Sequence, residues 1–494
     1  MRSRYVAATA VVAALGTLVA AAYAVLGPQP EQQARRDGCG RSRQDEFSRL
    51  APGWVYVDDG GSVRTGPPPP PRWVKGVVDA AGASPLGVHP SGGDDPTTHD
   101  AFDLNLNVRP DAGYEELLGG DPEARNGNFE GEGEETGRIH IEREETSLPS
   151  FVWPETGDRV AALGSWVWDC GHWDPGGERT ELHPYRALWT ERRPSPRSPF
   201  GDSEGDLYMS TDATPAGQIA ECSHKTRGDR TAYQRCTHEQ SNWLDVSGDY
   251  ELSLQAPPRP PSARRLVVRY VDKGSTIALR RATLEGRNAR LVFRLDAAPG
   301  KRLVLAEEVF LGWRPVPRAS RPVHLRLTFS RLLTRRSMDP ACAGCATPES
   351  TLTGQVVKSP GEWLLFTDVA GLWRLWPRVY PARDRSVFPV RVTQDLYAAR
   401  GRPFRLFVFT HECDFGTLSW SHAQNAMAPC PRSPDFGALS GDDVPGLIVR
   451  SFRTPGAALG LHREGGSTRP PSTCPAAANP HGCYELTYRV TRVR

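Results

Sequence analysis

The sequence has almost no net charge and lacks several short motifs that mark common enzymes. Its 494 residues include 60 Lys and Arg against 58 Asp and Glu, a formal net charge of +2. A nucleic-acid-binding face normally leaves a stronger basic excess, so we expect no nucleic-acid partner. A P-loop, a dinucleotide-binding GxGxxG after a strand and an HExxH motif are missing. The common nucleotide-dependent enzymes and zinc peptidases therefore have no support in the sequence.

Residues that break helices are abundant instead. The chain holds 48 Gly and 45 Pro, and hydrophobic residues make up 38% of it. This composition favours many short strands bounded by turns over long helices. No heptad pattern and no repeat of fixed period is visible. A chain of this length is also too long for one ordinary core, so we expect an all-β protein of two or three domains.

The N-terminus has the layout of an export signal. Positive charge in "MRSR" is followed by an almost uninterrupted apolar run from Tyr5 to Leu26. Ala22 and Ala24 form a small-x-small cleavage site, and the run is also long enough to span a bilayer uncleaved. We therefore expect residues 1–27 to be a signal peptide or a signal anchor. The rest would lie outside the cytoplasm, either secreted or anchored to the membrane by a single N-terminal helix.

Ten cysteines agree with export, because disulfides form outside the cytoplasm. Three pairs are close enough in sequence to close short loops, and two further cysteines would be left as a longer-range pair, although the connectivity stays open. The remaining two, Cys342 and Cys345 of "CAGC", favour a local bridge in a linker over a redox CxxC motif. The expected disulfide cysteines are Cys222 with Cys236, Cys413 with Cys430, Cys474 with Cys483, and Cys39 with Cys170. Each bridge would stabilise the fold by roughly 2–4 kcal/mol.

Shifts in composition divide the chain into segments. We expect a Pro- and Gly-rich linker over 28–71, a barrel-like module over 72–245, a sandwich-like domain over 246–335, a linker over 336–350 and a C-terminal β domain over 351–494. Short strands with long connections in the first module favour a small barrel, for which the five-stranded OB type is a candidate. The later strands favour one or two β-sandwich-like domains.

Two strands and one helix are predicted in detail. Apolar and polar residues alternate over Val323–Phe329, which predicts an antiparallel strand with one buried face. Phe404–Phe409 is apolar on both faces, which predicts a central strand covered on each side. Tyr114–Leu118 is the one short helix expected in the first module.

Four potential metal ligands fall within the stretch "WVWDCGHWDPGGERTELHPY" from Trp166 to Tyr185. They are Asp169, His172, Glu181 and His183. If the chain reverses at "DPGG", Glu181 and His183 lie on one face of the returning strand, and Pro184 favours extended geometry at His183. Two imidazoles and two carboxylates suit Zn²⁺ or another divalent first-row metal. The alternative is a buried polar network in which the carboxylates orient the histidines.

Three further stretches carry acidic residues or histidine. His99 and Asp103 lie just before a strand that could neighbour this cluster. "HECD", beginning at His411, follows a buried strand and is better explained as a solvated strand end. "DSEGDL" over Asp202–Leu207 is similar to the start of a calcium loop but lacks the Gly and the later Glu of an EF-hand.

These stretches resemble a group of uncharacterised secreted or membrane-anchored bacterial proteins. The group shares the string G-x-W-[IV]-x-D-x-x-H followed by E-[IL]-H-P, which here runs from Gly164 to His172 and from Glu181 to Pro184. "HDAFDLNLNVRPDAGYEELL", "IHIERE", "GEWLLFTDVAGLWRLW" and "RPFRLFVFTHECD" are similar to other parts of the same proteins. The resemblance implies a shared exported module and no particular activity.

The sequence therefore predicts an exported, disulfide-stabilised, multi-domain β-protein. We expect a cell-surface binding or structural module with a divalent-metal site and an extracellular ligand or surface partner. An extracellular metal-dependent hydrolase is the alternative, with Glu181 or Asp169 as general base and the two histidines holding the metal. An adhesion or carbohydrate-binding module is a third class, which would need exposed Trp and Tyr side chains.

Overall fold

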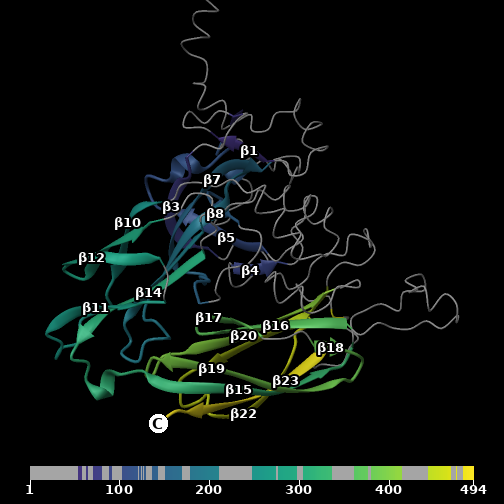
Figure 1. The fold of residues 1–494 in the computed structure, drawn as a ribbon. Coiled ribbons are helices and arrows are strands. Elements are labelled where there is room, and N and C mark those ends of the chain that lie inside the picture. Colours follow the sequence, from purple (N-terminus) through teal and green to yellow (C-terminus); the bar gives the residue numbers. More distant parts are fainter. Residues whose placement is uncertain are drawn as a thin grey trace, which may run out of the picture.

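A computed structural model shows a chain built almost entirely from antiparallel strand pairs (Figure 1). It describes residues 54–57, 63–64, 70–79, 88–91, 103–120, 122–123, 125, 127–129, 136–142, 151–169, 179–210, 247–273, 276–296, 304–336, 361–376, 380–413, 443–468, 474 and 482–494. Helical turns in these ranges are short 3-10 segments, at Glu115–Leu117, Gly127–Phe129 and Arg318–Ser320. The helix expected over Tyr114–Leu118 is the first of these turns. Within the described ranges, no helix has the length and apolar character needed to cross a bilayer.

Five strands of the first module close into a small barrel. They are β3 (Arg72–Val78), β5 (Asp103–Pro110), β6 (Ile139–Ile141), β7 (Arg159–Asp169) and β8 (Arg179–Arg192). Hydrogen bonding runs β3-β5-β6-β8-β7, and β7 pairs with β3 to complete the ring. The β6–β8 pair is parallel and the other four pairs are antiparallel. This order and this single parallel pair are the connectivity of an OB-type barrel.

Short strands extend the edges of the barrel sheet. β1 (Trp54–Val57) pairs with the end of β7, and β2 (Val63–Arg64) pairs with β1. β4 (Val88–Ser91) pairs with β5. The barrel interior is filled by side chains that alternate along the strands, because every second residue of a strand points to the same face. Its buried residues include Val74, Val108, Ile139, Ile141, Trp168, Leu182, Tyr185 and Leu188.

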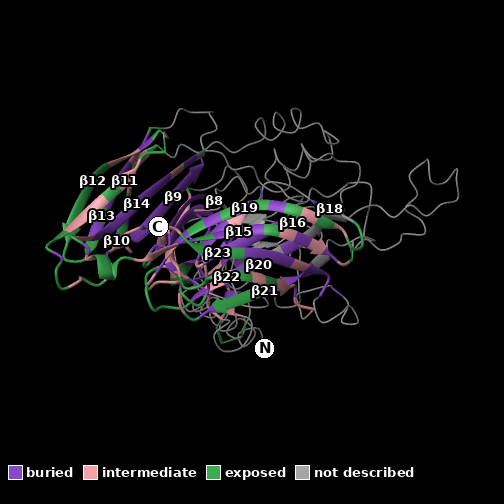
Figure 2. Ribbon diagram, turned by 90° about the horizontal axis from the view of Figure 1, so that it is seen from below, coloured by how far each residue is buried: buried purple, intermediate pink, exposed green. Residues whose placement is uncertain are grey.

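The second half of β8 leaves the barrel and begins a sandwich. There it pairs with β9 (Ser203–Ser210), which pairs with β14 (Val304–Arg314), which in turn pairs with β11 (Arg265–Val271). A three-stranded sheet of β10 (Gly248–Gln255), β13 (Asn288–Leu295) and β12 (Ile277–Glu285) packs on it. β9 is buried along its whole length, whereas β12 is largely exposed (Figure 2).

The C-terminal part is a second sandwich. One sheet has the order β19 (Val387–Ala398), β15 (Val323–Thr334), β23 (Tyr484–Arg492) and β22 (Gly460–Gly465). The other has the order β17 (Leu372–Leu375), β16 (Gly361–Val369), β20 (Phe404–Cys413) and β21 (Asp443–Phe452), and β18 (Tyr380–Ala382) pairs with β16. The two sheets enclose one core of aromatic and aliphatic residues.

These observations confirm the all-β prediction, with a barrel first and sandwiches after it. β15 also has the predicted pattern, since Leu325, Leu327 and Phe329 are fully buried and Arg326 is exposed. Its partners are β19 and β23, so strand pairing places it in the C-terminal sandwich and not in the 246–335 segment. The backbone hydrogen bonds that decide this come from strands far away in sequence.

β20 is the central strand that its apolar sequence predicts. Leu406 and Val408 face the interior of the C-terminal sandwich, and Phe407 packs on the opposite side against the barrel core. The same barrel-facing layer includes Phe366 and Trp373, whose rings lie 5.9 and 5.8 Å from the ring of Trp153. The barrel and the C-terminal sandwich therefore share a continuous apolar core.

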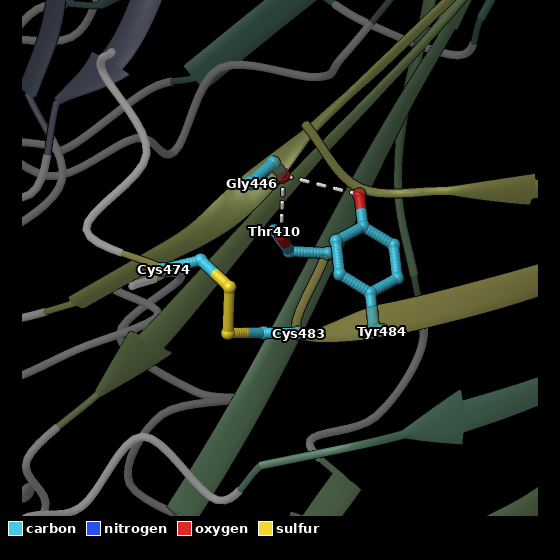
Figure 3. Close-up of a disulfide and its surroundings, with 5 residues drawn as sticks. All are labelled: Thr410, Gly446, Cys474, Cys483 and Tyr484. Atoms are coloured by element: carbon cyan, nitrogen blue, oxygen red, sulfur yellow. Dashed lines mark hydrogen bonds between the residues drawn. A yellow bond between two sulfur atoms is a disulfide. The ribbon is translucent and has the colours of Figure 1, made fainter. Parts of the chain in front are cut away.

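One expected disulfide lies in the C-terminal sandwich. Cys474 and Cys483 are bonded and buried, directly before β23 (Figure 3). Next to them the Tyr484 hydroxyl and the Thr410 hydroxyl both donate to the carbonyl oxygen of Gly446, at 3.1 and 2.7 Å. These bonds join β23 of one sheet to β20 and β21 of the other. The expected Cys222–Cys236, Cys413–Cys430 and Cys39–Cys170 pairs involve residues outside the described ranges.

Candidate metal centre

The only parallel strand pair in the described part of the barrel brings two acid–histidine pairs together. Register places His140 of β6 beside Glu181 of β8. The Glu142 N–H donates to the Leu182 carbonyl at 3.1 Å, which extends the pairing by one residue. His140, Glu142, Glu181 and His183 alternate with the core residues Ile141 and Leu182, so they belong to the outer face of the barrel wall.

Two β-bulges in β8 lie next to this cluster. His183 and Pro184 together oppose the single residue Ser165 of β7, and Arg186 is a second extra residue. Proline has no N–H, so the Tyr185 N–H donates in its place to the Glu142 carbonyl, at 3.1 Å. Each extra residue shifts the inward–outward alternation of the side chains by one position. The first shift places Tyr185 in the barrel core. The bulged segment is where β8 exchanges β6 for β9 as its neighbour.

Histidine and glutamate alternate along the contacts of the cluster, in the order His140, Glu142, His183 and Glu181. Nδ1 of His183 lies 2.9 Å from Oε1 of Glu181 and 3.7 Å from Oε2 of Glu142. Nε2 of His140 lies 3.4 Å from the same Glu142 oxygen. One ligand atom from each of His140, Glu142 and Glu181 can be chosen so that all lie within 4.8 Å of one another. Ligands about 2.0–2.1 Å from a tetrahedral zinc ion lie roughly 3.3 Å apart, so small side-chain rotations would close this set on an ion.

Asn107 of β5 fixes the tautomer of His140. Its Oδ1 lies 2.9 Å from Nδ1 of the imidazole, and an amide oxygen can only accept a hydrogen bond. Nδ1 therefore carries the proton, and in the neutral ring the lone pair of Nε2 points to the Glu142 carboxylate. Two acceptors at 3.4 Å repel each other unless a proton or a cation lies between them. A polar second partner that holds the far nitrogen is also the usual arrangement of a metal-binding histidine.

Most of the cluster is closed to solvent. The side chains of His183, Glu142 and Glu181 are 0%, 1% and 4% exposed, whereas that of His140 is 22% exposed. Burying two carboxylates is costly unless opposite charge or hydrogen-bond donors compensate. The histidines supply part of this compensation through their contacts with Glu142 and Glu181. His140 is the one member of the cluster that an ion from solvent would meet first.

The structure brings together two of the four ligands that the sequence predicts. Glu181 and His183 are in contact, on one face of β8. Asp169 ends β7 and is aligned with Arg179, whereas Glu181 is aligned with Val167, two residues away. The side chain of Asp169 and the whole of His172 lie outside what the structure describes, as do His99 and the side chain of Asp103.

His140 and Glu142 are the members of this cluster that the sequence analysis did not identify. The string "IHIE" has a histidine and a glutamate two residues apart around an apolar residue, which is the reverse of "ELH" over Glu181–His183. Both strings therefore display an acid and a histidine on one strand face. That shared pattern was the available signal, although nothing in it says that the two strands are neighbours.

A second acidic cluster has a different chemistry. Glu204 and Asp206 of β9 and Glu308 of β14 lie within 4.8 Å of one another and are buried. Arg197 pairs with all three carboxylates, at 2.6 Å from Asp206 and 2.9 Å from Glu308, and also contacts Glu204. Arg192 pairs with Asp206, and Lys273 pairs with Glu308. Fixed cations already occupy this site, so it is an ion-pair network and not a candidate for a metal.

The network separates the pKa values of its two closest acids. Burial disfavours the charged form of Glu204, but the guanidinium groups of Arg197 and Arg192 outweigh it and lower the pKa of this carboxyl. Burial raises the pKa of Asp206 well above its usual value, and the charge of Glu204 raises it further. Of these two acids, Glu204 therefore ionises more readily than Asp206.

One string in this region has the spacing of a hydrolase nucleophile elbow but not its structure. Gly201-Asp202-Ser203-Glu204-Gly205 matches GxSxG. An elbow places the serine on a sharp turn between a strand and a helix. Here Ser203 begins β9, which continues to Ser210, and the residue is fully buried. The string forms part of the ion-pair network, and the serine is not accessible to a substrate.

Comparisons with known proteins leave the candidate site to be judged by its geometry. No family model matches the sequence, and no curated protein matches it either.

Proposed function

We propose that the protein is an exported, multi-domain β-protein of the cell surface whose barrel binds one divalent metal ion, best zinc, as a structural element. The ligands are His140, Glu142 and Glu181, with His183 holding the Glu181 carboxylate. The observation that carries this proposal is the Asn107 hydrogen bond, which directs the Nε2 lone pair of His140 to a glutamate oxygen at 3.4 Å. Export rests on the N-terminal sequence, with the chain secreted or anchored by one N-terminal helix.

Burial favours a structural ion over a catalytic one. A catalytic zinc keeps an open coordination position for water and needs access for a substrate. Glu142, Glu181 and His183 are almost fully buried, which leaves only the His140 side of the site for exchange with solvent. An ion here would join β6 to β8 and so hold the barrel closed. A metal-dependent hydrolase is therefore the less favoured alternative.

The test is the metal content of the purified protein. We expect about one equivalent of zinc in the wild type, and loss of that equivalent in His140→Ala, which removes the most accessible ligand. Asn107→Ala removes only the outer hydrogen bond and is expected to weaken binding roughly 10–100-fold. A chelator should lower the unfolding temperature of the wild type but not that of His140→Ala, because bound metal stabilises only the folded state.

The chain offers a matched control in His324 of β15. Its side chain is 26% exposed and its Nε2 lies 3.5 Å from a carboxylate oxygen of Asp395, so it resembles His140 in exposure and pairing. No third potential ligand joins this pair in the described part of the chain. His324→Ala should keep its zinc. An absence of metal in the wild type, or equal metal in His140→Ala, would leave the four residues of the cluster as a polar network that only braces the barrel.

A further inference from the structure

The small net charge of the chain conceals a strong division along the sequence. Residues 1–247 contain 24 Lys and Arg against 38 Asp and Glu, whereas residues 248–494 contain 36 against 20. The first half therefore carries a formal charge of −14 and the second half one of +16. Such an asymmetry is typical of proteins whose basic part meets a polyanion. The net charge of the whole chain does not reveal it.

Part of this excess lies on the outer face of the C-terminal sandwich. The sheet β19-β15-β23-β22 buries its inner face in the core, and its outward positions alternate with the buried ones (Figure 2). Five arginines occupy this face: Arg326 and Arg331 of β15, Arg391 of β19, Arg489 of β23 and Arg463 of β22. We call these five residues the arginine face.

Two members of the arginine face already have acidic partners. Arg326 makes a bidentate pair with Asp395, at 2.7 and 2.8 Å, and Arg331 lies 3.5 Å from Glu485. Arg391, Arg463 and Arg489 are exposed, and none of them has an ion pair with a described carboxylate. The face therefore has three guanidinium groups with capacity for an external anion.

Strand register aligns these three groups across the sheet. Arg489 lies beside Thr328 of β15 on one side and Leu461 of β22 on the other. Arg463 lies beside Thr487, two residues from Arg489 along β23. Arg391 is on β19, beyond β15. The row crosses four strands, which span roughly 14 Å at the usual strand spacing. Its dimensions suit one extended polymer chain.

From this arrangement we propose that the arginine face binds a linear acidic polysaccharide. The large exposed hydrophobic residues of the described chain are aliphatic, and the rings of His324 and Tyr397 on this face are stacked on each other and only partly exposed, which disfavours stacking on sugar rings or single-stranded bases. Charge is left as the means of recognition. The choice of a polysaccharide over a nucleic acid rests on the proposed export. A linear polymer matches a row of guanidinium groups that crosses one sheet more closely than a flat anionic bilayer does.

The test compares two sets of three exposed arginines. Arg391→Gln, Arg463→Gln and Arg489→Gln are combined in one variant, and Arg280→Gln, Arg290→Gln and Arg294→Gln in the control. The control arginines lie on the β10-β13-β12 sheet and pair with Asp296, Glu251 and Asp249. Both variants remove three charges from exposed strand positions. Only the first variant removes guanidinium groups that have no ion pair with a described carboxylate.

Binding is measured to polygalacturonate, with neutral dextran as a blank. We expect wild type and control to bind with similar affinity, the face variant to bind at least about tenfold more weakly, and the salt dependence of the face variant to fall by roughly one unit of slope per arginine lost. Equal binding by both variants, or no binding by the wild type, would overturn the proposal. Preference for duplex DNA or for phosphatidylglycerol vesicles would overturn the choice of partner. A lysine version of the face variant should retain binding, which separates lost charge from lost folding.

Discussion

At the scale of single residues, the partner of a buried acidic side chain decides what that side chain does in this molecule. Glu142 and Glu181 contact histidines of the adjacent barrel strands β6 and β8, whereas Glu204 and Asp206 contact arginines of β8 and of its connection to β9. The residue types are similar, but a histidine can exchange a proton for a metal and an arginine cannot. The first pair can therefore hold an ion and the second pair only holds the fold together.

Another buried acid, Asp368 of β16, allows a test of pH dependence. Its Oδ1 accepts the N–H of Gly371 at 2.7 Å in the turn to β17, and it is 1% exposed. Burial raises the pKa of Asp368 well above its usual 3.8, the neighbouring Glu155 raises it further, and Arg405 opposes the rise. The folded state therefore keeps a proton that the unfolded state releases above about pH 4. Stability falls as pH rises from that point toward the folded pKa.

Asp368→Asn should remove this pH dependence, because asparagine accepts the same hydrogen bond and does not ionise. We expect its unfolding temperature, relative to the wild type, to increase between pH 5 and pH 8. Asp395→Asn is the control with the opposite sign, since Arg326 lowers the pKa of the exposed Asp395. The unfolding temperature of Asp395→Asn, relative to the wild type, should not increase over the same pH range. A pH-independent difference between wild type and Asp368→Asn would contradict the assignment.

At the scale of elements, the sandwich depends on close approach between β8 and β9. Gly205 of β9 lies under the indole of Trp189, and a Cβ built on the glycine would be 2.1 Å from two of its ring atoms. Trp189 is 1% exposed and packs on Phe293 at 5.9 Å, so the ring cannot move aside without opening the core. Only glycine allows this contact.

Gly205→Ala is therefore expected to destabilise the protein by about 1–3 kcal/mol, the usual cost of an overpacked core. The measurement is the denaturant midpoint at constant slope. Gly456→Ala is the matched control, because the nearest atom to its Cβ would be Thr454 Oγ1 at 3.9 Å, an ordinary contact. Equal midpoints for the two variants would mean that Trp189 can adopt another position at little cost.

At the scale of the whole molecule, the barrel and the C-terminal sandwich are joined by an aromatic contact. Trp153, which precedes β7, packs against Phe366 and Trp373 on the outer side of the C-terminal sandwich. Arg405 and Glu155 lie 3.5 Å apart at the same junction. Apolar burial of this kind supplies most of the free energy that holds two packed modules together.

Trp153→Ala should uncouple the two parts. Removing a buried tryptophan typically costs 3–5 kcal/mol, and here most of the loss falls on the junction. We expect calorimetry to show two separate unfolding transitions in place of one. Trp313→Ala is the control, because Trp313 is half-buried inside the first sandwich, where its indole donates to the Pro257 carbonyl at 2.9 Å. It should lower stability without changing the number of transitions.

The sequence by itself determined the elements whose pattern is local. Alternation over Val323–Phe329 and the doubly apolar Phe404–Phe409 predicted one half-buried and one central strand, and both are present. The short spacing of Cys474 and Cys483 predicted their disulfide. The period of two along a strand also placed Glu181 and His183 on one face. Each of these follows from residues close together in the chain.

Only the tertiary structure decided which strands are neighbours. Hydrophobic period tells which face of a strand is buried, but it does not identify the strand that supplies the hydrogen bonds. β6 meets β8 because the barrel closes, which brings His140 and Glu142 to Glu181 and His183. In the same way β15 joins the C-terminal sheet, and arginines from four strands come to share one face. Such pairings depend on closing long loops around a common core, and no local pattern contains them.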